Sequence, residues 1–231
     1  MAKIVAPNPG PMTLEGTNTY LYGSGPCVVI DPGPADAGHL DAVRAAAGER
    51  GGIGLVLLTH SHGDHSEGAE GLGAETILPA GGEIHAGLRA IATPGHAADH
   101  VCFLGAEGVC FAGDLVLGLG STIVPPGGGS LAAYMGSLRL LFEQEIDLIA
   151  PGHGPWVTDP TAKLEEYVEH REMRERRLLA ALDDGERSRA ALLTNVWSDV
   201  PAELLPMAAM AMEAHLEKLE EEGRLPGDVY E

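Results

Sequence analysis

The stretch Leu55-Val56-Leu57-Leu58-Thr59-His60-Ser61-His62-Gly63-Asp64-His65 decides the fold. Its first four residues are apolar, and a run of this length is typical of a buried strand. His60 and His62 are two positions apart, so in an extended segment they face the same side and can bind one metal ion. Asp64 and His65 lie beyond the turn and can reach a neighbouring ion. The stretch therefore predicts a strand that carries metal ligands at its carboxyl end.

Three further apolar runs end in the same way. Arg89–Ala92 leads to His96, Val109–Ala112 leads to Asp114, and Leu148–Ala150 leads to His153. In folds of strands and helices, the loops after the strands converge over one edge of the sheet. We therefore expect one cluster of imidazoles and carboxylates, made of His60, His62, Asp64, His65, His96, Asp114 and His153.

This donor set favours catalytic transition-metal chemistry. Imidazole and carboxylate ligands suit zinc and its first-row neighbours, and the lack of cysteine in the set argues against a structural zinc site. The set is too large for one tetrahedral ion, but it suits two ions that share a bridging ligand. Two ions about 3.5–4 Å apart lower the pKa of a water between them. We predict two Zn²⁺ ions per chain, with Mn or Fe as substitutes, and Asp64 and Asp114 as catalytic residues.

The remaining histidines are interpreted as structural. A single histidine near a strand end is more often exposed or hydrogen-bonded than bound to metal, and this interpretation covers His39, His85, His170 and His215. His100 follows His96 closely and is intermediate, because it can support the ligands by hydrogen bonds.

The quoted run, with His96, Asp114 and His153, resembles the HxHxDH signature and later ligands of the metallo-β-lactamase superfamily. The resemblance implies an α/β fold, the αββα sandwich, with a binuclear site at one edge of the two sheets. It implies that His60, His62 and His96 hold the first metal. It implies that Asp64, His65 and His153 hold the second, with Asp114 as the bridge. Asp31 matches an early acidic position and is implied to hydrogen-bond to the ligands.

A narrower resemblance covers nearly the whole chain. The segments similar to the beta-lactamase-like protein 2 family are Leu14–Leu21, Tyr134–Leu138, Pro151–Pro155, His170–Glu175 and His215–Leu219. Characterised members of that family cut single-stranded RNA using zinc. The resemblance therefore implies a zinc-dependent endoribonuclease, with single-stranded RNA as its partner.

Other activities remain open. Thioester hydrolysis of the glyoxalase II kind uses the same ligands on a small thioester, although no basic and aromatic set for glutathione is evident in the tail. Antibiotic hydrolysis is disfavoured because no signal peptide is evident. Flavodiiron redox chemistry is disfavoured by His62, where those proteins have glutamate. A mononuclear iron persulfide dioxygenase would need only His60, His96 and Asp114. A non-catalytic metal-binding module is the last alternative.

The C-terminal part is predicted to be a separate helical unit. We expect a metallo-β-lactamase-like catalytic domain over residues 1–162 and a helical, winged-helix-like domain over 163–231. The expected helices are Lys163–Asp183, one that follows Ser188 and runs to about Trp197, and Pro206–Glu222, with an apolar stripe that includes Leu204. Arginines that can touch phosphates are Arg171, Arg174, Arg176, Arg177, Arg187 and Arg189. Glutamates interleave with them, which favours a solvated helix with i,i+4 pairs.

Composition limits the partners and the location. The formal charge of −20 repels nucleic acid, so a polyanionic substrate needs a local positive feature such as the metals. No apolar run approaches the roughly 18 residues of a membrane span, which predicts no membrane partner. Prolines between Pro7 and Pro11 interrupt any signal-like core, so we expect a cytoplasmic protein with reduced cysteines.

The segments Val101–Leu104 and Val109–Ala112 are predicted to form a β-hairpin. A four-residue loop between them would pair position 102 with 111 and so place Cys102 and Cys110 on opposite faces of the sheet.

Overall fold

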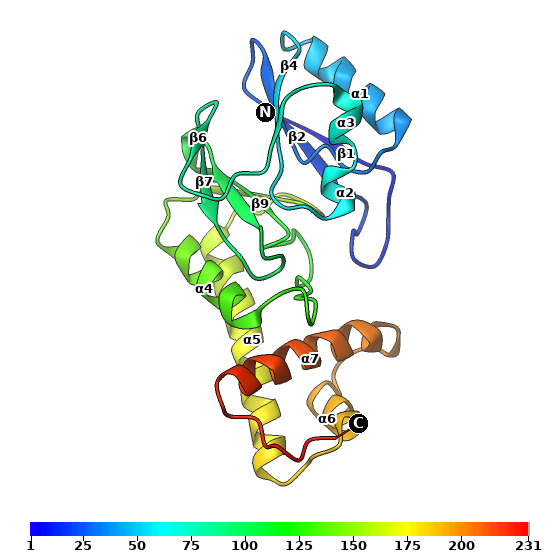
Figure 1. Ribbon diagram of the computed structural model, residues 1–231, viewed down its shortest axis with the longest axis vertical. Helices are drawn as coiled ribbons and strands as arrows, with labels where there is room; N and C mark the ends of the chain where they lie inside the picture. Colours follow the sequence, from blue (N-terminus) through cyan, green and yellow to red (C-terminus); the bar gives the residue numbers. More distant parts are fainter. Residues whose placement is uncertain (231) are drawn as a thin grey trace.

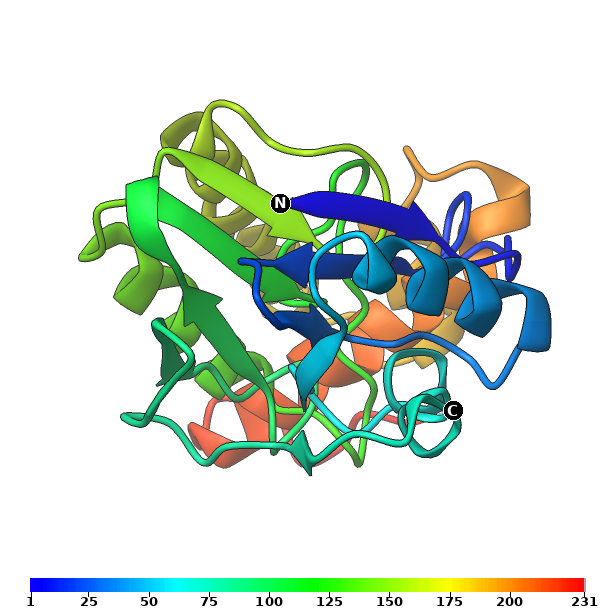
Figure 2. The ribbon, with the colours of Figure 1, turned by 90° about the horizontal axis from the view of Figure 1, so that it is seen from above.

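Two five-stranded sheets lie face to face in the computed structural model, which describes residues 1–230 (Figures 1 and 2). The first sheet has the order β1-β2-β3-β4-β5 and the second the order β10-β9-β8-β7-β6. The strands of the first sheet are β1 (Ala2–Val5), β2 (Asn18–Tyr22), β3 (Cys27–Ile30), β4 (Ile53–Leu57) and β5 (Thr76–Ile77). Those of the second are β6 (Ile84–His85), β7 (Leu88–Ala92), β8 (Val101–Leu104), β9 (Val109–Gly113) and β10 (Leu148–Pro151).

Alternating side chains of the inner strands build the layers. In β3, Val28 and Ile30 pack into the cluster between the two sheets, where they join Phe103 of the second sheet. Val29, between them in sequence, packs on the opposite face with Val43 of the helix α1 (Ala37–Gly48). Successive side chains of a strand point to opposite sides, so this short apolar strand contributes to both clusters and is buried on both faces. The predicted αββα sandwich is confirmed.

Helices cover the outer face of each sheet. The first sheet carries α1 and α3 (Ala69–Leu72), and α2 (Gly63–Ser66) follows β4. The second sheet carries α4 (Leu131–Phe142) and the first half of α5 (Pro160–Asp183). Asp36, Ser130 and Asp159 begin α1, α4 and α5 by accepting a backbone N–H, which satisfies one of the free donors of the first turn.

The C-terminal helices form a cluster of their own, drawn in orange and red in Figure 1. Here α6 (Arg189–Val196) and α7 (Leu205–Glu221) pack against the second half of α5. Ser188 caps α6 as expected. Leu204 is a correction to the predicted stripe, because it ends a short 3-10 helix, η2 (Ala202–Leu204), and is 41% exposed. The division at 162/163 falls in the first turn of α5 and stays a prediction.

The register of one hairpin differs from the sequence-based expectation. The expected loop pairs position 102 with 111, but the structure pairs Phe103 with Phe111 and Leu104 with Cys110. Cys102 and Cys110 therefore lie on the same face of the sheet, and both belong to the cluster beneath α4. A shift of one residue in register moves every side chain of a strand to the other face. All three cysteines are free and buried.

Within residues 1–230, no helix combines the length and the hydropathy needed to cross a bilayer.

Candidate metal centre

The seven predicted ligands come together at the carboxyl ends of four strands. The loop after β4 carries His60 and His62, and α2 carries Asp64 and His65. The loops after β7, β9 and β10 carry His96, Asp114 and His153. Three overlapping groups of these side chains have ligand atoms close enough to hold metal ions. The gathering arises because β4 and β9 are each paired in parallel with a neighbour, so that these loops leave the same edge.

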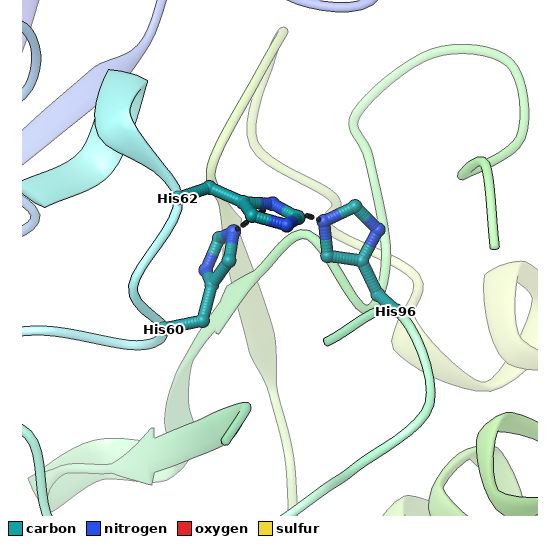
Figure 3. Close-up of side chains that lie close together, drawn as sticks. All are labelled: His60, His62 and His96. Carbon is teal, nitrogen blue, oxygen red and sulfur yellow. Dashed lines mark hydrogen bonds between the residues drawn. The ribbon is translucent and has the colours of Figure 1, made fainter. Parts of the chain in front are cut away.

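His60, His62 and His96 point toward one another from two loops (Figure 3). The Nε2 atom of His60 lies 3.0 Å from Nδ1 of His62, which lies 2.9 Å from Nε2 of His96. Zn–N bonds of about 2.0–2.1 Å in a tetrahedron place neighbouring ligand atoms about 3.3 Å apart. The three nitrogens fit one face of such a tetrahedron.

Asp64, His65 and His153 form a second group. The Nε2 atoms of His65 and His153 are 3.3 Å apart. Oδ2 of Asp64 lies 3.4 Å from Nε2 of His153 and 3.7 Å from Nε2 of His65. These separations again match the edges of a coordination tetrahedron, with a carboxylate oxygen in place of one imidazole.

The carboxylate of Asp114 lies between the two groups. Its Oδ2 is 3.6 Å from Nε2 of His96 in the first group. Its Oδ1 is 3.3 Å from Nε2 of His153 and 3.4 Å from Nε2 of His65 in the second. Oδ1 is also buried without a hydrogen-bond donor, which is costly for a carboxylate unless a cation is bound. The donor set therefore fits two divalent cations with Asp114 between them.

Hydrogen bonds behind the cluster fix the tautomers of the histidines. Nδ1–H of His96 donates to the carbonyl of Ile123 at 2.7 Å, and Nδ1–H of His153 donates to the carbonyl of Gly16 at 3.2 Å. Each bond leaves Nε2 facing the cluster, where it can bind a metal ion once it carries no proton. An imidazole with its other nitrogen held in this way is oriented for metal binding.

Asp31 and Thr59 orient two of the predicted ligands through hydrogen bonds. Asp31 Oδ2 accepts hydrogen bonds from His65 Nδ1–H at 2.9 Å and from the Thr59 hydroxyl at 2.8 Å. The Thr59 oxygen in turn accepts from Nδ1–H of His60 at 2.9 Å. Asp31 lies where the resemblance implies. Thr59 was missed, although its position at the polar end of an apolar run was a usable signal.

His100 holds Asp114 in place and has no nitrogen free to bind a metal ion. The backbone N–H of Asp114 donates to Nε2 of His100 at 3.2 Å, and Nδ1–H of His100 donates to the Thr93 hydroxyl at 2.9 Å. Burial, aided by the nearby His96, lowers the pKa of His100 to about 3, so the ring is neutral. Both of its nitrogens are used, which leaves none for a metal ion.

The electrostatics of the cluster favour cations. Burial alone would raise the pKa of Asp114, but His65 and His153 hold it well below its usual range. Burial lowers the pKa of His153, yet Asp114 and Asp64 outweigh it and raise that pKa to about 9. The negative field that retains a proton on His153 also stabilises a divalent cation in its place. Metal binding therefore releases protons and weakens at low pH.

A cleft of about 780 Å³ opens onto the metal centre and reaches the C-terminal helices. Loops of the two-sheet part of the chain contribute Met12, Leu14, Leu117 and Leu119. The C-terminal part contributes Trp197, Val200, Leu204, Met207, Ala208 and Ala211. Met12, Leu119 and Leu204 are 51%, 58% and 41% exposed, so the cleft presents apolar surface to solvent. Exposed apolar surface in a cleft is typical of a binding site for a ligand or a partner.

Replacing Asp31 with alanine is expected to weaken metal affinity by about 10–100-fold, because it releases His65 and Thr59 from their fixed orientation. A competition titration with a coloured chelator measures this loss. Asp36→Ala is the control, since Asp36 caps α1 and touches no metal ligand. Unchanged metal affinity in Asp31→Ala would show that the ligands are oriented without it.

Comparison with known proteins agrees with this geometry. Residues 12–87 and 74–153 match the metallo-beta-lactamase superfamily. The chain belongs to this superfamily. Residues 188–225 match the beta-lactamase associated winged helix domain, which confirms the predicted winged-helix-like part. The superfamily is one of hydrolases, and the family and fold expected from the ligand pattern are confirmed.

Three relatives are similar to this chain in sequence. Lactamase-like protein adaB of Aspergillus niger is 40% identical over 82% of this chain, and this chain spans 65% of its length. The beta-lactamase-like protein 2 homolog of Drosophila melanogaster is 33% identical over 96% of this chain and 88% of its own length. Atrochrysone carboxyl ACP thioesterase of Aspergillus chevalieri is 36% identical over 82% of this chain and 66% of its own.

Two solved structures share the fold. A metallo-beta-lactamase family protein from Thermus thermophilus superimposes with a TM-score of 0.76 at 25% identity, over 96% of this chain and 93% of that chain. A protein crystallised in a di-iron-bound form has a TM-score of 0.56 at 26% identity, over 74% of this chain and 98% of its own. Within this fold, the grouped histidines and aspartates of this chain indicate a metal-binding site.

Proposed function

We propose that this chain is a metal-dependent thioester hydrolase whose substrate carries an extended apolar group. The observation that carries this proposal is the apolar cleft, which leads from the metal centre to the wall formed by Trp197, Leu204 and Met207. An apolar chain bound there gains about 25 cal/mol for each Å² of its surface removed from water. The named thioesterase among the relatives supports the same reaction class.

The protonation states in the cleft also favour a thioester. Within the described residues 1–230, the titratable side chains that line the cleft outside the metal centre are His170, Arg171 and Arg174. Burial, with Arg171 and Arg174 nearby, lowers the pKa of His170 to about 4, so it is neutral at pH 7 and a poor proton donor. A thiolate, whose conjugate acid has a pKa near 8.5, leaves without a proton far more easily than an alkoxide does.

The roles of the residues follow from their positions. His60, His62 and His96 would hold one divalent cation and Asp64, His65 and His153 the other, with Asp114 shared between them. When bound, such cations polarise a carbonyl oxygen and lower the pKa of water. Asp31, Thr59 and His100 keep the ligands oriented, and the apolar wall aligns the acyl group. The oxygen of water bonds to the carbonyl carbon and gives up one proton to solvent. The C–S bond then breaks, so that the acyl group leaves as a carboxylic acid and the thiolate takes a proton from solvent.

Cleavage of single-stranded RNA is the second candidate. It is implied by the resemblance to the beta-lactamase-like protein 2 family, and the likeness to the Drosophila homolog over 96% of this chain favours it. The arginines of the C-terminal part give it little support, because all but Arg171 form ion pairs with acidic side chains of the chain itself. Arg174 and Arg177 pair with Asp199, Arg176 with Glu172, Arg187 with Asp228, and Arg189 with Glu213, while Arg171 is buried.

The test is a substrate panel combined with one variant of the cleft wall. Turnover of thioesters is expected to rise with acyl length, and Met207→Glu should lower kcat/KM for a long acyl chain by about tenfold or more, since it places a charge in the apolar wall. Acetyl thioester turnover should change little. Leu205→Glu is the matched control, because Leu205 is 38% exposed on the same helix but does not line the cleft.

The panel also includes single-stranded RNA, single-stranded DNA and nitrocefin. Cleavage of RNA without acyl-length dependence would replace the thioester proposal with the second candidate. Equal effects of Met207→Glu on long and short acyl groups would show that the cleft does not bind the acyl chain.

A further inference from the structure

A second cavity, of about 400 Å³, lies among α4, α5 and α7. It shares Arg171 with the cleft, but its other lining residues differ from those of the cleft. Its charged lining consists of five basic residues, Arg139, Arg171, Arg176, Lys218 and Arg224, and three acidic ones, Glu172, Glu175 and Glu222. In a chain with a formal charge of −20, a cavity with more basic than acidic lining residues is unusual.

The carboxylates of this cavity are already shared by the outer cations. Glu175 accepts from Lys218 at 2.7 Å and from Arg224 at 3.1 Å, and Glu222 is 2.7 and 2.9 Å from the same two side chains. Glu172 pairs with the exposed side chains of Arg139 and Arg176. Each of the three carboxylates thus faces two cations, and none of them pairs with Arg171.

Arg171 is a buried cation without a counter-ion. It is 4% exposed, and its guanidinium forms no ion pair with any acidic residue of the described chain, residues 1–230. One nitrogen, Nη2, donates to the hydroxyl of Ser121 and to the carbonyl of Thr122, while Nε is buried with no acceptor. The face of Tyr134 is 5.4 Å away. A buried charge without a partner is strongly destabilising, which indicates that a ligand supplies the missing anion.

His215 is a second buried group with free nitrogens in the same cavity. It is 1% exposed, and neither Nδ1 nor Nε2 has a hydrogen-bond partner. Buried polar atoms are rarely left in this state unless water or a ligand completes them. Arg171 of α5 and His215 of α7 therefore both line this cavity, and each has a buried nitrogen without a hydrogen-bond partner.

We propose that this cavity binds a small oxyanion, phosphate or the phosphoryl group of a phosphomonoester. The anion would pair with Arg171, accept a hydrogen bond from its Nε, and accept another from the ring of His215. A tetrahedral oxyanion suits donors that come from two helices at once, because its oxygens point in several directions. The proposal does not depend on the reaction at the metal centre.

The test is isothermal titration of the metal-loaded full chain with sodium phosphate and, separately, with glycerol 3-phosphate. Ionic strength is held constant with sodium chloride, so that general screening does not change. Phosphate is expected to bind the wild type, and Arg171→Met and His215→Leu should each weaken binding by about tenfold or more. Arg177→Met is the matched control on the same helix, because Arg177 lies outside this cavity, and it should bind as the wild type does.

The outcomes separate the sources of the ligand. Binding of phosphate alone identifies the free ion, and tighter binding of glycerol 3-phosphate identifies a phosphomonoester. Phosphate held only at the metal centre would bind equally well to all four proteins, and this result would overturn the proposal, as would no binding to the wild type. Arg171→Met also releases Ser121 and Thr122, whereas His215→Leu breaks no hydrogen bond, so His215→Leu decides the matter if the first variant fails to fold.

Discussion

Asp114→Ala is expected to lower kcat/KM by at least about two to three orders of magnitude, because it removes the carboxylate that faces both metal positions. Oδ1 lies near His65 and His153, and Oδ2 lies near His96. No other carboxylate faces both groups within residues 1–230. The loss should therefore affect both ions, whereas loss of a ligand to one group would leave the other intact.

The measurement combines steady-state kinetics on the thioester panel with elemental analysis of the protein after exhaustive dialysis. Asp41→Ala is the control, since Asp41 forms an exposed i,i+3 pair with Arg44 that contributes little. Full activity with two retained ions in Asp114→Ala would show that the site does not depend on a bridge.

Gly152→Ala should cost about 100-fold in activity, although the residue carries no side chain. A methyl group added there would lie 2.5 Å from Oδ1 of Asp114 and 2.7 Å from Cε1 of His65. Both distances are too short, so the ligands or the strand end must move. A displacement of about 1 Å in a catalytic geometry is enough for such a loss.

Metal content and circular dichroism should be measured beside activity, so that a local displacement can be told from unfolding. Gly136→Ala is the matched control, because Gly136 lies within α4 and an added methyl group would meet open space. That change should be neutral or should stabilise the helix by up to about 1 kcal/mol. Normal metal content and activity in Gly152→Ala would mean that the site adapts to the extra carbon.

The seven candidate ligands could be predicted from the sequence because each depends on a short stretch of residues. Each predicted ligand follows a short apolar strand by a few residues, and a strand fixes where the next residues leave the sheet. His60 and His62 needed only their spacing to be assigned to one group, which Figure 3 shows converging with His96. The helix cap at Ser188 was similarly local, because a cap depends on the three residues that follow it.

Features that depend on small differences in packing were less predictable. The β8–β9 hairpin differs from expectation by one residue, and that shift places Cys102 and Cys110 on one face. Leu204 fits a helical stripe in sequence but lies in a 3-10 turn beside the cleft, where it is partly exposed. Hydrophobic periodicity does not distinguish a residue that packs in the core from one that lines a binding surface.

The sequence by itself determined the family and the sandwich, and it predicted which seven side chains gather at one edge, because short motifs after successive strands carry that information. Only the tertiary structure decided how the ligands are oriented, since the partners of His96 and His153 lie 27 and 137 residues away. It also decided that Asp114 faces both groups and that the C-terminal helices complete an apolar cleft. Contacts between distant segments depend on how whole layers pack, and no local pattern of residues encodes that arrangement.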